Sequence, residues 1–391
     1  MSSSQQVYLT VSQRLADILP NERLTRRRNL ALFAPAQYIR DWVTALYLAS
    51  SCALTRLADH LLVNGNKDSR VQRLRRFLMN KRVDVRTVYG PVVGSLLTQM
   101  GNARIVLILD RTTLSNHLNI LTVSIAYRGR SLPLAWRVMR KQGQMQRCHL
   151  EAALRFVKRW APDSPHIWVV GDREFQDVGF QDFIEHELGW QYVQRITNNL
   201  WLYPEHGAPF QPKQLGLQPG QRRVFANVRV TRQQAGPAHF LAYWRRGEDE
   251  PWYLLSDQPI NRATIRIYAQ RFWVEPMYRD FKSFGWNIEA SRIRNPQRFS
   301  RLLLGTPSRT GTQCSTHWTA RDWVALAYVW LLQLASRVTQ ARRLDGVKRG
   351  WRRLVDRTAR RTLSYFRIGW NWLLRCINHG EPIVLPDLLY L

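Results

Sequence analysis

The run Ile105-Val106-Leu107-Ile108-Leu109-Asp110 decides the fold, because five consecutive apolar residues before a carboxylate are typical of a strand buried on both faces. A second run, Ile167-Trp168-Val169-Val170-Gly171-Asp172, again ends in an acid. Between them lie two more strand-like segments, 121–127 and 132–138, separated by a Gly-containing turn. Helical segments and a strand around 192–196 follow in alternation. This order predicts an α/β sheet whose first three strands are antiparallel.

The segments beyond these strands differ in composition. Residues 1–100 carry apolar residues at helical spacing, and four arginines gather between 70 and 76. We expect a helical N-terminal DNA-binding region there, the alternative for the arginines being a solvated helix face. Residues 101–300 form the predicted catalytic domain. Its part at about 200–258 is rich in Pro and Gly and then alternates between polar and apolar residues, which predicts an inserted β subdomain.

Residues 301–391 are expected to be a helical C-terminal region that binds DNA or dimerises. Two features stand out there. The segment 305–322 has almost no large apolar residues and indicates a loop that interrupts an apolar helical pattern. The segment 342–361 is strongly basic, which favours a second DNA contact or a partner subunit, with a solvated helix face as the alternative.

The charge of the chain indicates a polyanionic partner. Its 391 residues carry 58 Lys and Arg against 28 Asp and Glu, a formal charge of +30. Nucleic acid is the usual partner of so basic a protein, the alternative being a proteome with a general basic bias. A hydrophobic content of 45% excludes a globally disordered chain.

Other classes are disfavoured by what the sequence lacks. The cysteines at 52, 148, 314 and 376 form no C-x-x-C pair, which argues against a zinc or disulfide framework. The N-terminal residues show no secretory pattern, and the longest apolar stretch, 324–332, is too short to span a bilayer. We therefore expect a cytoplasmic, nucleoid-associated protein with no membrane partner.

The scarce acids are more informative than the many bases. Asp110 and Asp172 both end buried strands, where the edge of a sheet commonly binds ligands. The structural alternatives are that Asp172 caps the following helix and that Asp110 closes a turn. Glu174 and Asp177 lie close enough to Asp172 to replace it, but Asp172 comes first after the strand.

A helix at about 263–282 carries four polar residues on one face. Tyr268, Arg271, Glu275 and Lys282 are separated by 3, 4 and 7 positions, which at about 100° per residue places them within an arc of roughly 60°. Simple ion pairing on an amphipathic helix is the alternative. Pro276 removes a backbone N–H within this helix, so we also expect a kink there.

The pattern Tyr-x2-Arg-x3-Glu-x6-Lys resembles the signature of DDE transposases of the fourth family of bacterial insertion sequences. The segments around Asp110 and Asp172 resemble the first and second Asp motifs of that family. The resemblance covers about residues 35–300. It implies a ribonuclease H-like mixed sheet core with a helical N-terminal domain, a β insertion and a helical C-terminal region.

The resemblance also implies the chemistry. Asp110, Asp172 and Glu275 would be catalytic and would hold two Mg²⁺ ions, for which Mn²⁺ can substitute, and Asp110 would bridge them. Tyr268, Arg271 and Lys282 would bind the phosphate beside the scissile bond. The partners would be double-stranded DNA, both terminal inverted repeats and target, and a second copy of the chain on paired ends.

The resemblance implies cut-and-paste excision and strand transfer through a hairpin intermediate. In this family a flipped base commonly stacks on a Trp of the β insertion, for which Trp201, Trp244 and Trp252 are candidates beside the alternative of core packing. Two other functions stay open. One is a catalytically inactive or domesticated DNA-binding derivative, and the other is a related nuclease without strand transfer.

Overall fold

The computed structural model describes residues 5, 9, 41, 44–46, 48–80, 85–101, 103–140, 146–163, 166–282, 285–303 and 365–379. The polar segment 305–322 and the basic segment 342–361 lie outside these residues, as does most of the expected C-terminal region.

The strands of the described residues form one continuous mixed sheet. Its order is β3-β2-β1-β4-β5-β9-β8-β7-β6. Strands β1 to β3 are antiparallel, β4 and β5 run parallel to β1, and β9 returns antiparallel to β5, as the sequence predicts for the first five strands. The bounds are Ile105–Leu114 (β1), Leu118–Tyr127 (β2), Arg130–Arg140 (β3), Ile167–Gly171 (β4), Gln191–Arg195 (β5), Leu202–Tyr203 (β6), Arg222–Val230 (β7), Ala235–Tyr243 (β8) and Trp252–Ser256 (β9).

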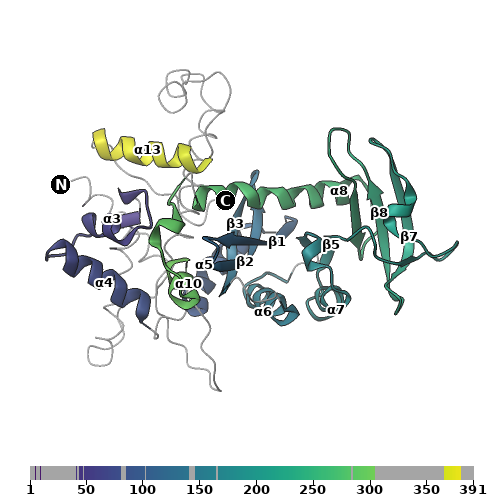
Figure 1. Ribbon diagram of the computed structural model, residues 1–391, viewed down its shortest axis with the longest axis horizontal. Helices are drawn as coiled ribbons and strands as arrows, with labels where there is room; N and C mark the ends of the chain where they lie inside the picture. The colour runs from purple at the N-terminus through teal and green to yellow at the C-terminus, as the bar shows by residue number, and fades with distance from the viewer. Residues whose placement is uncertain are drawn as a thin grey trace, which may run out of the picture.

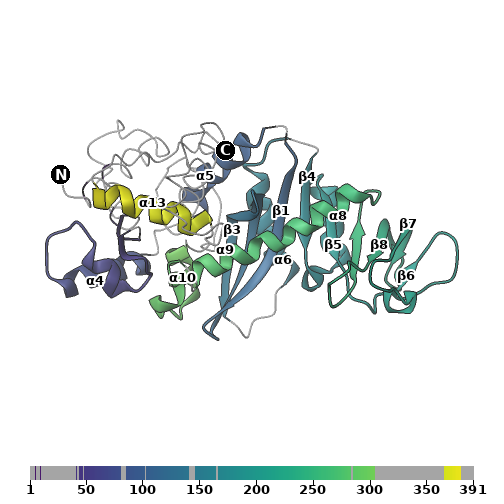
Figure 2. The same ribbon diagram turned by 90° about the horizontal axis from the view of Figure 1, so that it is seen from above.

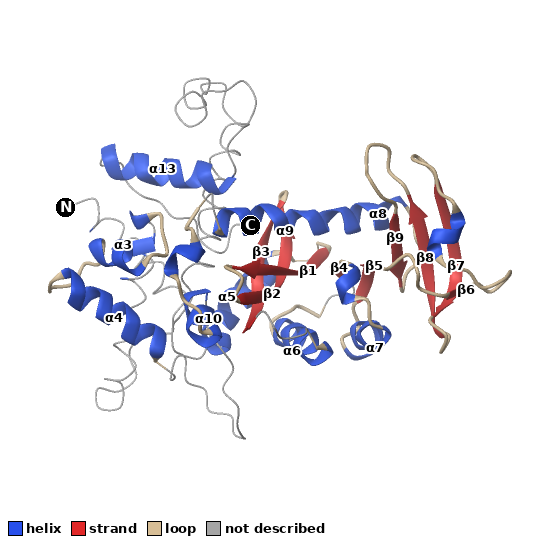
Figure 3. Cartoon of the chain, viewed as in Figure 1, coloured by secondary structure: helices blue, strands red, loops and turns tan. Residues whose placement is uncertain are grey.

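Helices cover both faces of this sheet. Helices α6 and α7 lie on one face, while α8 and α9 form a long rod across the other (Figures 1 and 3). The bounds of the named helices are Leu54–Asp59 (α3), Lys67–Met79 (α4), Val85–Gln99 (α5), Arg147–Lys158 (α6), Val178–Asp182 (α7), Arg262–Ala269 (α8), Val274–Phe281 (α9), Pro296–Leu303 (α10) and Tyr365–His379 (α13). The layers are therefore helix, sheet and helix.

Burial explains the central strands. Every residue of β2 is buried, so this strand packs against both helical layers. The first five residues of β1 are buried as well, but burial alternates with exposure from Asp110 onward. Helix α6 begins with a reciprocal cap between Gln146 and His149, and its buried residues line the face toward the sheet. The core thus centres on β1, β2 and β4.

The β insertion continues the central sheet. Strand β9 pairs with β5, so β6 to β8 extend the same sheet outward (Figure 2). They also have a small core of their own around Phe240, which contacts the rings of Phe210, Phe225 and Tyr253. The expected strands are present, joined in register to the central strands.

Trp286 contacts described residues from both the N-terminal and the C-terminal parts of the chain. Trp286, fully buried after α9, donates its Nε1–H to Leu46 O at 3.3 Å and lies 5.8 Å, ring to ring, from Trp370 of α13. Its carbonyl accepts the N–H of Cys52 at 2.7 Å. One side chain therefore joins described parts of the N-terminal, catalytic and C-terminal regions.

Candidate active site

Asp110 lies where the pairing of β1 with β4 has ended. Strand β1 runs on to Leu114, so the expectation that the strand ends at Asp110 is wrong. The parallel pairing, however, stops at Ile108 opposite Val170. Continuing this register by two residues sets Asp110 of β1 beside Asp172, which directly follows β4. The two acids therefore meet at the same edge of the sheet, as expected of parallel strands.

Asp172 also caps the turn that follows it. Its Oδ1 accepts the backbone N–H of Arg173 at 2.8 Å and lies 3.9 Å from Nη1 of Arg195, at the end of β5. Its side chain is 28% exposed, so it is open to a ligand as well as acting as a cap. Asp172 is thus a capping residue, and its partly exposed carboxylate can also bind a ligand.

The predicted polar helix face points toward β1. The guanidinium of Arg271 lies between two acids, with Nη1 3.6 Å from Asp110 Oδ1 and Nη2 3.4 Å from Glu275 Oε1. Lys282 Nζ donates to Thr112 Oγ1 and to Thr113 O, both at 2.8 Å. Tyr268 is fully buried and its hydroxyl has no hydrogen-bond partner. Arg271 thus connects Asp110 with Glu275, and Lys282 lies against the residues that follow Asp110 on β1. Tyr268 packs against Trp252 and Phe272.

Pro276 lies in the first turn of α9, and the helical rod is interrupted just before it. A turn of 3₁₀ helix at Gln270–Trp273 separates α8 from α9. The two helices nevertheless continue in one direction in both views, so the expected kink is wrong (Figures 1 and 2). Tightening the turn before Pro276 accommodates the missing N–H without bending the rod.

The carboxyl of Asp110 is difficult to ionise in the free protein. Burial raises its pKa to about 7, Arg271 opposes the rise, and the charges of Glu174 and Asp172 add to it. Burial also lowers the pKa of Lys282. A buried acid whose like-charged neighbours resist its ionisation is a site that a further cation would stabilise.

Four charged residues near the site were missed by sequence reasoning: Arg111, Arg173, Arg195 and Glu250. Arg111 pairs with Glu174 at 2.7 Å, and Arg195 and Arg173 both bind Glu250. Arg111 and Arg173 directly follow Asp110 and Asp172, so their positions in the sequence could have indicated that they lie near the site. Arg195 ends a strand next to β4, a position like that of Asp172, whereas nothing local marks Glu250.

The donor set fits a divalent cation of the Mg²⁺ type. Asp110, Asp172 and Glu275 offer only carboxylate oxygens, which such ions prefer. Two of these acids already share one cation, the guanidinium of Arg271. In the described residues no three His, Cys, Asp or Glu side chains stand arranged to hold a metal ion. Binding would therefore require Arg271 to give up its position between Asp110 and Glu275.

The raised pKa of Asp110 predicts how stability depends on pH. In the unfolded chain the pKa of Asp110 is near its ordinary value, whereas in the folded chain it is about 7. The folded chain therefore binds the proton more tightly, and the free energy of unfolding falls as pH rises from about 4 to 7. With a chelator at pH 8, we expect Asp110→Asn to raise the free energy of unfolding by up to about 4 kcal/mol. Denaturant titrations at pH 4 and pH 8 measure it.

The gain should fall to below about 1 kcal/mol near pH 4, close to the ordinary pKa of an aspartic acid, and should vanish only at lower pH, where the wild-type carboxyl is protonated in both states. Asp163→Asn, at a fully exposed acid, is the matched control and should change stability little at either pH. An Asp110→Asn protein that is less stable than wild type at pH 8 would contradict a strained, buried carboxylate.

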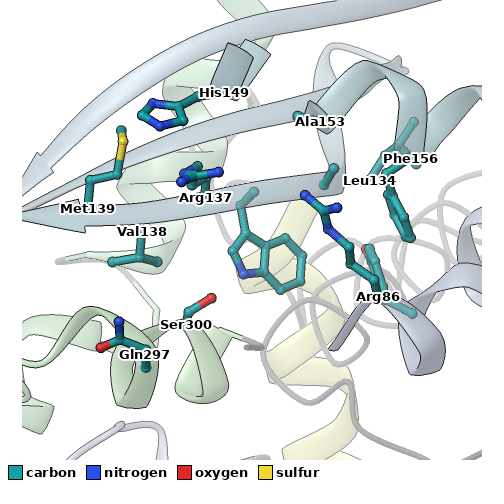
Figure 4. A pocket seen from close by; sticks show the side chains of 13 residues that line it. Arg86, Leu134, Arg137, Val138, Met139, His149, Ala153, Phe156, Gln297 and Ser300 are labelled. Atoms are coloured by element: carbon teal, nitrogen blue, oxygen red, sulfur yellow. The ribbon is translucent and has the colours of Figure 1, made fainter. Parts of the chain in front are cut away.

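Two cavities in the described residues contain none of the three acids. One of about 180 Å³ lies at the β3 edge, where Arg86, Arg137 and His149 approach from different elements (Figure 4). The other, of about 520 Å³, lies at the β1–β2 hairpin beyond Lys282, and its lining includes His117, Arg292 and Arg294. Both linings include arginines, and that of the second cavity also includes Glu289.

Of the three tryptophans proposed to stack a flipped base, one is excluded from that role by packing. Trp252 is buried under α8 and lies 5.1 Å from the ring of Tyr268 and 5.7 Å from that of Phe272. Trp244 donates its Nε1–H to Glu248 O at 2.9 Å and is partly exposed, as is Trp201. The choice between Trp201 and Trp244 stays a prediction.

The mixed sheet, with Asp110 within β1 and Asp172 directly after the neighbouring strand β4, has the architecture of a ribonuclease H-like fold, which is found in enzymes that cut or join nucleic-acid strands. The model of the transposase DDE domain family matches residues 102–306, more than half of the chain. The chain belongs to the transposase DDE domain family. No curated protein matches it. Membership supports nuclease and transposase activity on DNA, and members generally use divalent metal ions.

No described helix is both long enough and apolar enough to cross a membrane.

Proposed function

We propose that this transposase excises and inserts an insertion sequence by metal-dependent cut-and-paste, with Asp110, Asp172 and Glu275 as the catalytic acids. One observation carries the proposal: Arg271 binds both Asp110 and Glu275 while Asp172 lies beside Asp110, so acids 165 positions apart in sequence face one cationic centre. Cleavage of DNA that carries the element's terminal repeats, with and without Mg²⁺, tests it.

The three acids would hold the metal ions, two Mg²⁺ or Mn²⁺. Bound ions would activate water or a 3′-hydroxyl and stabilise the leaving oxygen. Asp110 would hold a cation only without its proton, so its raised pKa would make binding stronger as pH rises through about 7. Arg271, freed from Asp110 and Glu275, would then be available to the scissile phosphate.

Lys282 and Tyr268 would position the same phosphate. Lys282 is held against β1 by Thr112 and Thr113, only two and three residues beyond Asp110, so its charge stays close to the acids. The buried hydroxyl of Tyr268 lacks a partner, and the charges of Arg271 and Asp172 both reach it. A phosphate oxygen would supply the missing partner.

We expect replacement of Lys282 by Met to lower the cleavage rate by about 10- to 100-fold, because a charge that stabilises the transition state is lost while the methylene chain is kept. Arg266→Gln is the matched control, since Arg266 lies exposed on α8 in the same helical rod. Single-turnover cleavage measures both. Equal rates for the two variants would contradict the role of Lys282.

The wider protein would deliver and pair the DNA ends. In this proposal residues 1–100 bind DNA, residues 101–300 cut it and residues 301–391 bind DNA or dimerise, with one homodimer on two paired ends. The basic cavity beyond Lys282 would carry the DNA backbone away from the acids, through Arg292 and Arg294. In the first region α4 presents Arg75 and Arg76 to solvent.

An inactive DNA-binding derivative and a nuclease without strand transfer are the alternatives. The first would bind terminal repeats and show no metal-dependent cleavage. The second would cut the ends but would not join the released 3′-hydroxyl to target DNA. A single reaction with labelled ends and a supercoiled target separates the three outcomes.

A further inference from the structure

Two arginines next to Asp172 share one carboxylate that comes from the β insertion. Oε1 of Glu250 accepts from Nη2 of Arg173 at 2.8 Å and from Nη2 of Arg195 at 2.7 Å. Nη1 of Arg173 lies 3.5 Å from the second oxygen, Oε2. Two guanidinium groups converge on one anionic group, an arrangement equally suited to a phosphate.

Arg195 is held more firmly than the other two side chains of this contact. Arg195 has a side chain only 10% exposed, and its Nη2 also donates to Pro251 O at 3.3 Å. Glu250, in contrast, is 51% exposed and lies in the loop between β8 and β9. Arg195 is therefore fixed at the end of β5, whereas Arg173, 48% exposed in the turn after β4, lies at the surface with Glu250, which can turn out to solvent.

The site lies directly beside a proposed catalytic acid. Arg173 follows Asp172 in sequence, and Nη1 of Arg195 lies 3.9 Å from Asp172 Oδ1. Glu250 thus joins the insertion to the strand ends that carry the chemistry, over 55 residues of sequence from Arg195. None of the residues assigned to the phosphate by the signature, namely Tyr268, Arg271 and Lys282, takes part in this contact.

We infer that Arg173 and Arg195 form a second phosphate-binding site beside Asp172, which Glu250 closes in the free protein and which a DNA phosphate opens by displacing Glu250. This inference rests on the proposed function, since the phosphate would belong to the DNA strand that enters the active site. A carboxylate and a phosphodiester each carry one negative charge, so the exchange leaves the charge around the two arginines unchanged.

The exchange predicts that removing the charge of Glu250 strengthens DNA binding. The experiment uses the full chain carrying Asp110→Asn, which suppresses cleavage, and a fluorescein-labelled DNA duplex of mixed sequence without metal. Fluorescence anisotropy gives the Kd. We expect Glu250→Gln to bind about fivefold more tightly, because DNA no longer competes with two ion pairs. The slope of log K against log salt should also steepen by about one ion.

Asp249→Asn is the matched control. It removes the same charge from the neighbouring, exposed position and has no contact with either arginine, so the general electrostatic effect cancels. If Glu250→Gln binds no more tightly than Asp249→Asn, the inference is wrong. Adding Arg173→Gln to Glu250→Gln should reduce the gain to about twofold or less, and a gain that persists in full would also overturn it.

Two further readouts separate folding and function from this site. Thermal melting shows whether the Glu250→Gln protein is folded. If it is not, Glu250→Asp serves as a second variant. Its shorter side chain should pair more weakly with the two arginines, so its affinity for DNA should lie between those of wild type and of Glu250→Gln. Cleavage by the wild type judges the proposed function. If the wild type does not cleave but Glu250→Gln binds DNA more tightly, the proposed activity is wrong and the phosphate site stands. If the wild type cleaves but Glu250→Gln binds no more tightly, the phosphate site is wrong and the proposed activity stands.

Discussion

Metal-dependent cleavage of the element's ends should fall by about 10³-fold or more when Asp110 is replaced by Asn. The amide keeps the shape of the side chain but removes the charge that would hold the cation. The same loss is expected for Asp172→Asn and for Glu275→Gln. Because three ligands of one centre act as a unit, combining two of these substitutions should cost little more than one. Single-turnover rates measure each variant.

Retained folding distinguishes this result from simple misfolding. Asp110→Asn should be at least as stable as wild type at pH 8 without metal, because it no longer buries an ionised carboxyl. An inactive but more stable protein would therefore support a catalytic role. Cleavage at near wild-type rate by any of the three variants would remove that residue from the proposed centre.

Replacing Trp286 by Ala should lower the free energy of unfolding by about 3–5 kcal/mol. The indole is fully buried, packs 5.8 Å from the ring of Trp370 and donates to Leu46 O. Its loss leaves a cavity and an unpaired carbonyl where three regions of the chain meet. Denaturant titration measures the change, and limited proteolysis should show faster cleavage on either side of residues 105–303.

Trp201→Ala provides the comparison, since Trp201 lies partly exposed in the insertion. A cost below about 1 kcal/mol is expected there. If Trp286→Ala costs no more than Trp201→Ala, the terminal regions do not dock through this side chain.

The central strands β1 and β4 were predictable because buried strands are rich in apolar residues. The apolar runs at 105–109 and 167–170 correspond to the buried parts of β1 and β4. The second half of β1 was missed, since burial there alternates with exposure at Arg111 and Thr113, and a short polar alternation resembles a loop. The face of Tyr268, Arg271, Glu275 and Lys282 followed from helical geometry alone.

The electrostatic details depended on contacts that sequence spacing does not encode. Arg271 meets Asp110 across 161 positions, and Glu250 meets Arg195 only because β9 pairs with β5. Clustered Pro and Gly residues led us to expect an inserted β subdomain. Its pairing with the central sheet was not predictable, because β9 pairs with β5, a strand far from it in the sequence. Pro276 was expected to bend the helix. Instead, the turn before it is a 3₁₀ turn and the helical rod stays straight (Figures 1 and 2).

The central claim is that Asp110, Asp172 and Glu275 form one metal centre, and the position of a bound ion tests it most directly. Crystals of the full chain with terminal-repeat DNA and Mn²⁺ should show anomalous difference peaks in contact with all three carboxylates, with Arg271 turned away from Asp110. Manganese bound elsewhere, or a site at which Arg271 still bridges Asp110 and Glu275, would contradict the account.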